Sequence, residues 1–258
     1  MATITTELVK ELRDATGISV MQCKRALEEA DGNMEKALAI LKKTSGDIAL
    51  KKADRNAKDG AVMVKTENGK SVLVALRCET DFVSKNEDFV SLLKNLTDIA
   101  FKDGAEKVKE VSKEMIDPII QKTGENIQLG EIYEVQGDVL GVYVHNNKKA
   151  VIVSLEGGSQ ELAKDIAMHI TAMKPEYIRE EDITAEAKNT MLEIFQKEVE
   201  KIDKPEEIKK KMLEGKIGTY FKEKTLINQP SIKNPDETIG QILAKAKAKI
   251  KEVKSYSI

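Results

Sequence analysis

One arrangement of apolar runs and turn residues occurs twice in this chain, and it restricts the possible folds more than any other feature. In the first copy, Asn68-Gly69 separates apolar runs at 60–64 and 71–76, and in the second, the polar residues 145–148 separate two further runs. Asn-Gly between apolar runs indicates a β-hairpin because both turn positions require positive φ. A helical pattern follows each hairpin, so we predict an α+β fold with a sheet layer and a helix layer. The repetition indicates two related ββα halves, or only that ββα is a common arrangement.

The helix expected after each hairpin has an apolar face that can cover a sheet. Apolar residues recur every three or four positions in both stretches, which is the helical period. The inward positions of the first helix are Phe89, Leu92, Leu93, Leu96, Ile99 and Ala100, and those of the second are Leu162, Ile166, Ile170 and Met173.

The start of the chain carries the signals of three short helices. Gly17 can end the first helix, and Ser19-Val20-Met21-Gln22 has the form of a capping box for the second. Asp31-Gly32-Asn33 separates the second helix from a third. We therefore predict a three-helix module over 1–43, followed by a polar linker over 44–59 in which a helix is allowed.

Residues 184–224 have the pattern of a helical hairpin. Apolar residues recur every three or four positions on both sides of Asp203-Lys204-Pro205, forming a seam that one helix cannot bury alone. Proline is tolerated where a helix begins, so the second helix is expected to start there. The remaining boundaries place a first core half at 60–140, the first part of a second half at 141–183, and its closing segment at 225–258.

Charge and hydropathy argue against several classes of protein. The 258-residue chain has 42 Lys and Arg against 44 Asp and Glu, a net charge of −2, which disfavours a protein whose main task is to grip nucleic acid or an anionic membrane. No apolar run approaches the ~18 residues of a membrane span. The first seven residues lack the basic and apolar regions of a signal peptide. We therefore expect a cytoplasmic protein in which Cys23 and Cys78 stay reduced.

The sequence offers no recognisable catalytic or metal-binding constellation. His145 and His169 are not spaced with cysteines or carboxylates as zinc ligands would be. Gly69-Lys70-Ser71 imitates the end of a phosphate loop, but it lacks the earlier glycine and a strand follows it rather than a helix. We predict an interaction protein rather than an enzyme, with no cofactor and no metal. The alternative is an RNA- or ribosome-binding accessory protein that uses Lys209–Lys211 and the Lys-rich stretch 245–254, although the scarcity of aromatic residues disfavours it.

The two hairpin–helix units differ in the connection from strand to helix. In the first unit, residues 77–83 precede Ser84-Lys85-Asn86-Glu87, which has the form of a capping box. Thr80–Val83 is therefore expected outside the helix, on a surface connection. An apolar Phe82-Val83 pair in such a place is either a hydrophobic staple on the first turn of the helix or an exposed wedge for a partner. On physical grounds alone, the staple is the favoured alternative.

Two stretches of the chain resemble the signatures of one known family. Residues 12–27, which include Arg-Asp-Ala-Thr-Gly-Ile-Ser-Val-Met-Gln-Cys-Lys, are similar to the N-terminal signature of the translation elongation factor Ts family. Residues 78–86, Cys-Glu-Thr-Asp-Phe-Val-Ser-Lys-Asn, resemble its second signature. Weaker similar pieces follow in order and extend the resemblance over nearly the whole chain: Gly124–Ile127, Tyr143 with His145, Ala167–Ile170, Gln229-Pro230 and Thr238–Gly240.

The resemblance implies a fold and a function. It implies a UBA-like three-helix module at 1–43, two related core halves, and an antiparallel coiled coil at 184–224. It implies a guanine-nucleotide exchange factor that binds GDP-loaded elongation factor Tu, perturbs the Mg²⁺ and nucleotide site of that GTPase, and promotes GDP release so that GTP can bind during translation elongation. In the family, the Thr-Asp-Phe-Val segment is tied to dislodging the Mg²⁺. Carried over, this segment is Thr80, Asp81, Phe82 and Val83.

Supporting partner contacts follow from the same resemblance. They fall on Arg13, Met21 and Lys24 in the N-terminal module, where Met21 and Lys24 lie three apart on one helix face. His169 belongs to a family-like Ala-Met-His-Ile pattern and is expected at the interface. Core packing is the alternative for Met21, and a core or surface histidine is the alternative for His169. The 184–224 hairpin is expected to contact the partner or a second copy of this chain.

Some positions depart from the family pattern. Gln229-Pro230-Ser231 has serine where the family usually has phenylalanine, and Val253-Lys254-Ser255 stands in place of Phe-x-Arg. The loop after His145 lacks the usual Gly and Arg, and no C-terminal extension is expected after Ile258. These changes put contacts of the second half in question and leave the Thr80–Val83 segment intact.

Overall fold

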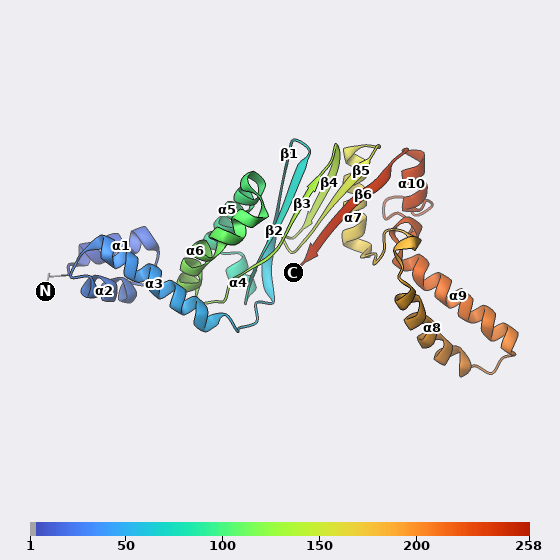
Figure 1. Cartoon of the computed structure of the whole chain (residues 1–258), viewed down its shortest axis with the longest axis horizontal. Helices are drawn as coiled ribbons and strands as arrows, with labels where there is room; N and C mark the ends of the chain where they lie inside the picture. The colour runs from blue at the N-terminus through green and yellow to red at the C-terminus, as the bar shows by residue number, and fades with distance from the viewer. Residues whose placement is uncertain (1–3) are drawn as a thin grey trace. The chain divides into compact units, whose positions relative to one another are not determined.

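The computed structural model describes residues 4–258 and divides into two compact units. The first unit contains the residues up to Val135, together with Val144–Ala150 and Tyr256–Ile258. The second contains Gln136–Tyr143 and Val151–Ser255. The described residues form helices and two three-stranded antiparallel sheets (Figure 1), as the predicted α+β class requires. Among these residues, every helix is too short or too polar to cross a bilayer.

The first unit begins with the predicted three-helix module. Helices α1 (Thr6–Thr16), α2 (Val20–Glu29) and α3 (Met34–Lys52) are capped by Thr5, Ser19 and Asn33, whose side chains accept backbone N–H bonds. Gly17 ends α1 with a φ of 68°, which a residue with a side chain adopts less readily. The module has its own aliphatic core, formed by Val9, Leu12, Ile18, Cys23, Ala26, Leu27, Ala30, Ala37 and Leu41.

Helix α3 continues beyond the boundary that we placed at residue 43. It extends to Lys52 and packs against α6 (Ala105–Thr123), so most of the expected 44–59 linker is part of a packed helix. Buried Ser45 and Ala49 lie in this stretch. Near its end, the Lys52 ammonium donates to the carbonyl of Gly124. The polar composition that suggested a linker therefore belongs to the exposed face of the helix.

The first sheet has the strand order β1-β2-β3, formed by β1 (Asp59–Glu67), β2 (Lys70–Cys78) and β3 (Gln128–Gln136). Strands β1 and β2 form the predicted hairpin, in which Glu67 pairs with Lys70 and the turn residues Asn68 and Gly69 have φ values of 49° and 73°. Helix α5 (Glu87–Asp103) packs on this hairpin through predicted inward residues, including the fully buried Phe89 and Leu96. No helix or strand was predicted for 105–136, where α6 and β3 lie.

The second unit repeats the order of elements in its core. Strands β4 (Val139–His145), β5 (Lys149–Glu156) and β6 (Lys249–Ser257) form a sheet in that order, and α7 (Gln160–Met173) follows the hairpin. The predicted inward positions of α7 are buried or half-buried, except that Met173 is exposed. A short helix, α10 (Ile239–Lys245), precedes β6, and a capping box between Thr238 and Gln241 starts it.

Two helices between α7 and α10 occupy the stretch predicted as a helical hairpin. They are α8 (Ala185–Glu200) and α9 (Glu206–Lys224), which pack against each other. Short 3₁₀ turns, η1 (Glu180–Asp182) and η2 (Leu226–Asn228), flank the pair. Each helix buries only one residue, Val199 in α8 and Phe221 in α9. The pair therefore leaves apolar side chains on its surface, namely Leu192, Ile194 and Ile208.

Candidate functional site

The segment that carries the second signature folds as a single helical turn, α4 (Asp81–Ser84), between β2 and α5 (Figure 1). The Ser84 N–H donates to the Thr80 carbonyl at 3.2 Å, which closes the turn. The Ser84 hydroxyl donates to the Asp81 carbonyl at 3.0 Å. The expected capping box at Ser84 is wrong, because α5 is capped by Asn86, whose side chain accepts from the Asp88 N–H at 2.9 Å. Ser84 is already used to close α4.

The two apolar residues of the segment have different environments. Val83 is half-buried and packs against the aliphatic core of the first unit. Phe82 is 82% exposed, the most exposed of the large apolar side chains in residues 4–258. A staple and an exposed wedge were the two alternatives for this pair. In the structure, Val83 packs as a staple would, and Phe82 is the exposed residue. Removing an aromatic ring from water is favourable, so a partner that covers the Phe82 ring would gain binding free energy.

The Glu125 carboxylate holds the N-terminal side of this turn. It accepts hydrogen bonds from the backbone N–H groups of Glu79 and Thr80 at 3.1 and 3.0 Å, and from the Thr80 hydroxyl at 2.5 Å. In return, the Glu79 carboxylate accepts from the N–H of Asn126 at 2.7 Å. Because its hydroxyl is bonded to Glu125, Thr80 does not cap α4 through its side chain. Glu125 was not among the predicted site residues, although Gly124–Ile127 was among the weaker family-like pieces.

A lysine from the β4–β5 turn holds the C-terminal side of α4. The Lys148 Nζ donates to the Asp59 carboxylate at 2.5 Å, to the Gly60 carbonyl at 2.6 Å and to the Ser84 hydroxyl at 3.1 Å. Burial raises the pKa of Asp59, but hydrogen bonds from Lys148 and the Gly60 N–H outweigh it, so the pKa lies below its ordinary value. Asp59 is therefore ionised at neutral pH and balances the charge of Lys148. In the sequence, this loop stands out only as a departure from the family pattern.

The side chains of Asp81 and Cys78 each form a hydrogen bond with one nearby group at the turn. The exposed Asp81 carboxylate pairs with Lys85 at 2.7 Å, one helical turn later, and this hydrogen bond raises the pKa of Lys85. Exposed pairs of this kind contribute little to stability. The Cys78 thiol donates to the Thr80 carbonyl at 3.1 Å, and burial raises its pKa to about 12. Cys78 is therefore a neutral packing residue beneath the turn rather than a reactive thiol.

The predicted residues of the N-terminal module lie on its surface. Met21 is 60% exposed, so core packing, the alternative for this residue, does not occur. Val20 beside it is also exposed, and Arg13 and Lys24 are exposed on α1 and α2. Lys24 pairs loosely with Glu28 at 3.7 Å. Helix α2 of the module thus presents the neighbouring apolar side chains of Val20 and Met21 together with basic ones.

His169 lies inside the second unit, which corrects the expectation of an interface histidine. It is 1% exposed, its Nε2 lies 2.9 Å from the Gln229 Oε1, and its Nδ1 accepts from the Ile232 N–H at 3.4 Å. Burial lowers its pKa, and the Gln229 bond opposes this only in part. Ser231, the departure from Gln-Pro-Phe, is buried too, and its hydroxyl accepts from the N–H groups of Lys233 and Asn234. The interior alternative for His169 is therefore the correct one.

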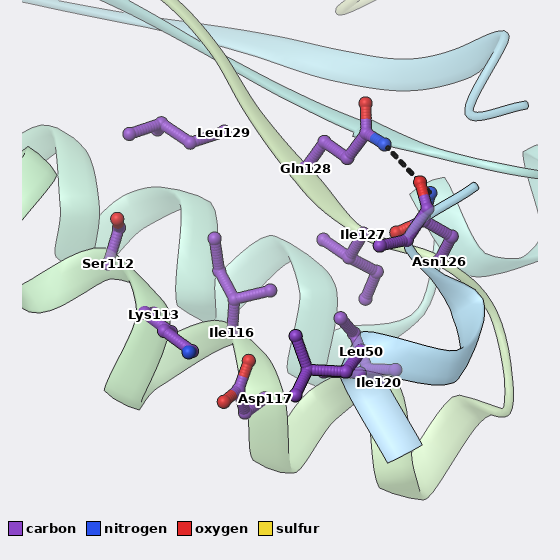
Figure 2. A pocket seen from close by; sticks show the side chains of 12 residues that line it. Leu50, Ser112, Lys113, Ile116, Asp117, Ile120, Asn126, Ile127, Gln128 and Leu129 are labelled. Atoms are coloured by element: carbon purple, nitrogen blue, oxygen red, sulfur yellow. Dashed lines mark hydrogen bonds between the residues drawn. The ribbon is translucent and has the colours of Figure 1, made fainter. Parts of the chain in front are cut away.

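A groove of about 450 Å³ lies in the first unit among the end of α3, helix α6 and the start of β3 (Figure 2). Its walls are mostly aliphatic, and Figure 2 shows Asp117 and Lys113 on α6 among the side chains that line it. Burial raises the pKa of Asp117, although Lys113 opposes the shift. This groove was not predicted from the sequence. The lining residues are Ala49, Leu50, Ala53, Ser112, Lys113, Ile116, Asp117, Ile120, Asn126, Ile127, Gln128 and Leu129.

The Phe82 turn offers an exposed apolar contact surface. Within residues 4–258, no group of three histidine, cysteine or carboxylate side chains is arranged to hold a metal ion. The Phe82 turn presents an exposed apolar ring. Hydrogen bonds of Thr80 and Ser84 on either side of the ring hold the turn against the rest of the protein.

Two family descriptions match the chain, and together they cover most of it. The family described as "Elongation factor TS" matches residues 79–258, and a "UBA-like domain" matches residues 5–42. The first match begins at the residue before Thr80 and includes the Phe82 turn, Glu125 and Lys148. The second coincides with the three-helix module up to the middle of α3.

Curated relatives match over nearly the full length. A protein of Hahella chejuensis called "Elongation factor Ts" is 40% identical over 265 aligned residues, which cover 100% of this chain and 93% of the relative. Proteins of the same name from Marinobacter nauticus and Cellvibrio japonicus are each 40% identical, over 95% and 99% of this chain and 88% and 90% of the relatives.

Proposed function

We propose that this chain, which belongs to the elongation factor Ts family of translation elongation factors, is a guanine-nucleotide exchange factor for elongation factor Tu. It binds the GDP-loaded GTPase, perturbs the Mg²⁺ and nucleotide site, and promotes GDP release so that GTP can bind. The exposed ring of Phe82 on its held turn is the observation that carries this proposal. The factor acts by binding and catalyses no bond-making step of its own, and we place it in the cytoplasm, where translation occurs.

Phe82 acts as a wedge, and its turn neighbours orient it. Burying a phenylalanine contributes about 1.5–3 kcal/mol, which is available to displace part of the partner near its nucleotide. The exposed Asp81 carboxylate accepts hydrogen bonds from the partner. Thr80 and Val83 act from within, because Thr80 is bonded to Glu125 and Val83 packs on the core.

Phe82 alone is not sufficient for exchange. By reciprocity, a factor that weakens GDP binding is itself weakened by GDP to the same extent, and a ~10⁴-fold effect requires about 5.5 kcal/mol of differential interaction. A broader interface must therefore contribute. We assign to it Met21, Arg13 and Lys24, all of which are exposed on the N-terminal module.

His169 has an indirect part in this proposal. Its ring bonds Gln229 and the N–H of Ile232, so it positions the 229–232 loop rather than contacting the partner itself. The exposed side chain of Ile232 on that loop is the surface that His169 would support.

The helical pair is proposed to be an antiparallel coiled coil that contacts the partner or a second copy. Its exposed Leu192, Ile194 and Ile208 support self-association, because a two-helix hairpin leaves such residues in water. Replacing Leu192 and Ile208 together by serine should shift any dimer towards monomer in light scattering coupled to size-exclusion chromatography. An unchanged dimer would exclude this surface as the contact.

We also infer that the two core halves descend from one duplicated unit. Each contains a hairpin, a following helix and a third strand that arrives later in the sequence. In the second half, the helical pair lies between that helix and the third strand, as an insertion would.

The exchange reaction can be measured directly. Elongation factor Tu is loaded with a fluorescent GDP analogue, excess unlabelled GTP is added, and analogue release is followed with and without this protein. We expect strong acceleration at micromolar factor. Release at the intrinsic rate throughout this concentration range would reject the proposal.

The alternative of RNA or ribosome binding has less support. In the proposed basic run, Lys209 pairs with Glu206 at 3.1 Å, which reduces its availability to phosphate. Binding of RNA with a steep salt dependence would favour this alternative.

A further inference from the structure

We propose that Glu125 and Lys148 are positioning residues that clamp the two ends of the Phe82 turn and hold the ring in a binding-ready orientation. The inference deepens the proposed exchange function and rests on it. Neither residue contacts the proposed partner. Both act on the Phe82 turn, Glu125 through Glu79 and Thr80 and Lys148 through Ser84.

The turn needs such support because it is too short to be stable alone. Forming the first turn of a helix is unfavourable, and a four-residue helix adds almost no further hydrogen bonds to offset this free energy. Its largest side chain, Phe82, points into solvent and contributes little packing. Within α4, only Val83 and Ser84 face inward enough to be half-buried or buried. The order of the turn must therefore come from outside it.

Glu125 supplies this order at the N-terminal end. Its carboxylate accepts three hydrogen bonds from Glu79 and Thr80, and hydrogen bonds to an ionised acceptor are stronger than neutral ones. In the opposite direction, the Glu79 carboxylate accepts a hydrogen bond from the Asn126 N–H. The β2–α4 junction and the α6–β3 junction are thus bonded in both directions.

Lys148 supplies it at the C-terminal end. Its ammonium reaches Ser84, the last residue of α4, while it also neutralises Asp59 and bonds the Gly60 carbonyl. Backbone bonds fix the loop that carries it: the Val62 N–H donates to the Asn147 carbonyl at 2.8 Å, and the Ile258 N–H donates to the Lys148 carbonyl at 2.9 Å. The lysine therefore acts from a rigid base within the first unit.

The clamp matters for binding because it orders the turn before the partner arrives. If the turn were mobile in the free protein, binding would have to restrain it and affinity would fall. Loss of the clamp should raise the factor concentration needed for half-maximal exchange more than it lowers the maximal rate. It should have no such effect in a protein whose ring has already been removed.

The experiment combines clamp variants with loss of the ring. Lys148→Met, Lys148→Arg and Glu125→Gln are prepared with Phe82 present and in a Phe82→Ala background. Each is assayed for release of a fluorescent GDP analogue from elongation factor Tu over a range of factor concentrations. The control is Lys65→Met, because Lys65 has similar exposure, 33% against 31%, and its ion-pair partners, Asp98 and Glu67, lie outside α4.

We expect Lys148→Met and Glu125→Gln to lower exchange efficiency about 3- to 10-fold when Phe82 is present, and less than 2-fold in the Phe82→Ala background. Lys148→Arg should restore most of the Lys148→Met loss, and Lys65→Met should change little. Equal losses in the two backgrounds would overturn the clamp, since the residues would then act independently of the ring.

A second measurement separates the clamp from the exchange function. Amide hydrogen exchange of Ser84, whose N–H bonds the Thr80 carbonyl, should become faster in Lys148→Met while amides in the middle of α5 stay unchanged. If wild-type protein fails to accelerate GDP release, the proposed function fails, yet this measurement still tests whether the turn is clamped. Unchanged Ser84 protection in both clamp variants would reject the clamp whatever the exchange assay shows.

Discussion

Replacing Phe82 with alanine tests the wedge with little disturbance of the fold. The ring is 82% exposed in the free protein, so its removal should change the free energy of unfolding by less than about 0.5 kcal/mol. Full burial of a phenylalanine contributes about 1.5–3 kcal/mol, so with 82% of the ring still exposed, about 1.2–2.5 kcal/mol remains to be gained in a complex.

This free energy converts into a measurable rate effect. At 1.36 kcal/mol for each factor of ten, exchange efficiency in the Phe82→Ala variant should fall about 8- to 70-fold. Phe82→Leu keeps a large apolar side chain and should lose less. The assay is release of a fluorescent GDP analogue at factor concentrations well below saturation, where efficiency is measured directly.

The control for this test is another exposed apolar residue. Met173 on α7 is exposed, and no contact with a partner has been assigned to it, so Met173→Ala should exchange as the wild type does. Urea unfolding of each variant verifies that stability is unchanged. If Phe82→Ala promotes exchange within 2-fold of wild type, the ring is not the wedge, even though family membership stands.

Three further predictions concern stability and reactivity. Burial holds the pKa of His169 below its ordinary 6.5, so the unfolded chain binds the proton more readily than the folded one. The contribution of His169 to the free energy of unfolding should therefore be complete above pH 6.5 and fall as the pH drops towards the folded pKa. Urea titrations of wild type and His169→Gln should differ in how steeply the free energy of unfolding falls over this pH range. Gly141→Ala would place a Cβ 2.0 Å from the backbone of α7 and should destabilise the protein by about 3 kcal/mol or more. Gly215→Ala lies on an open helix surface and should stabilise the protein by roughly 0.5–1 kcal/mol. Equal effects of the two substitutions in thermal unfolding would contradict this difference in packing. Cys78, with a pKa raised to about 12, should resist a thiol reagent at pH 8 until urea unfolds the protein, and rapid labelling of the native protein would show that its burial is not maintained.

Local signals in the sequence were sufficient for the elements that short-range geometry controls. Asn68-Gly69 predicts a hairpin because both residues must adopt positive φ, and both do. Ser19 and Gly17 mark helix ends because each satisfies backbone groups that the helix leaves unpaired. The same local reasoning placed Thr80–Val83 on a connection at the surface.

Local signals left both alternatives open where two interpretations differ only in packing. The 44–59 stretch has the polar composition of a linker, yet α3 continues through it to Lys52 because α6 covers one face. His169 has the same sequence context whether it is buried or exposed, and only the loop that carries Gln229 and Ile232 encloses it.

By itself, the sequence determined that this protein has two hairpin–helix halves, a three-helix module and a surface segment with an aromatic residue, since each depends on neighbours a few positions apart. Only the tertiary structure decided that Val83 faces the core while Phe82 faces solvent, and that Glu125 and Lys148 hold the turn between them. Thr80 and Glu125 are 45 positions apart, and Ser84 and Lys148 are 64 apart. Contacts over such separations depend on how sheets and helices pack, and no local pattern of residues encodes them.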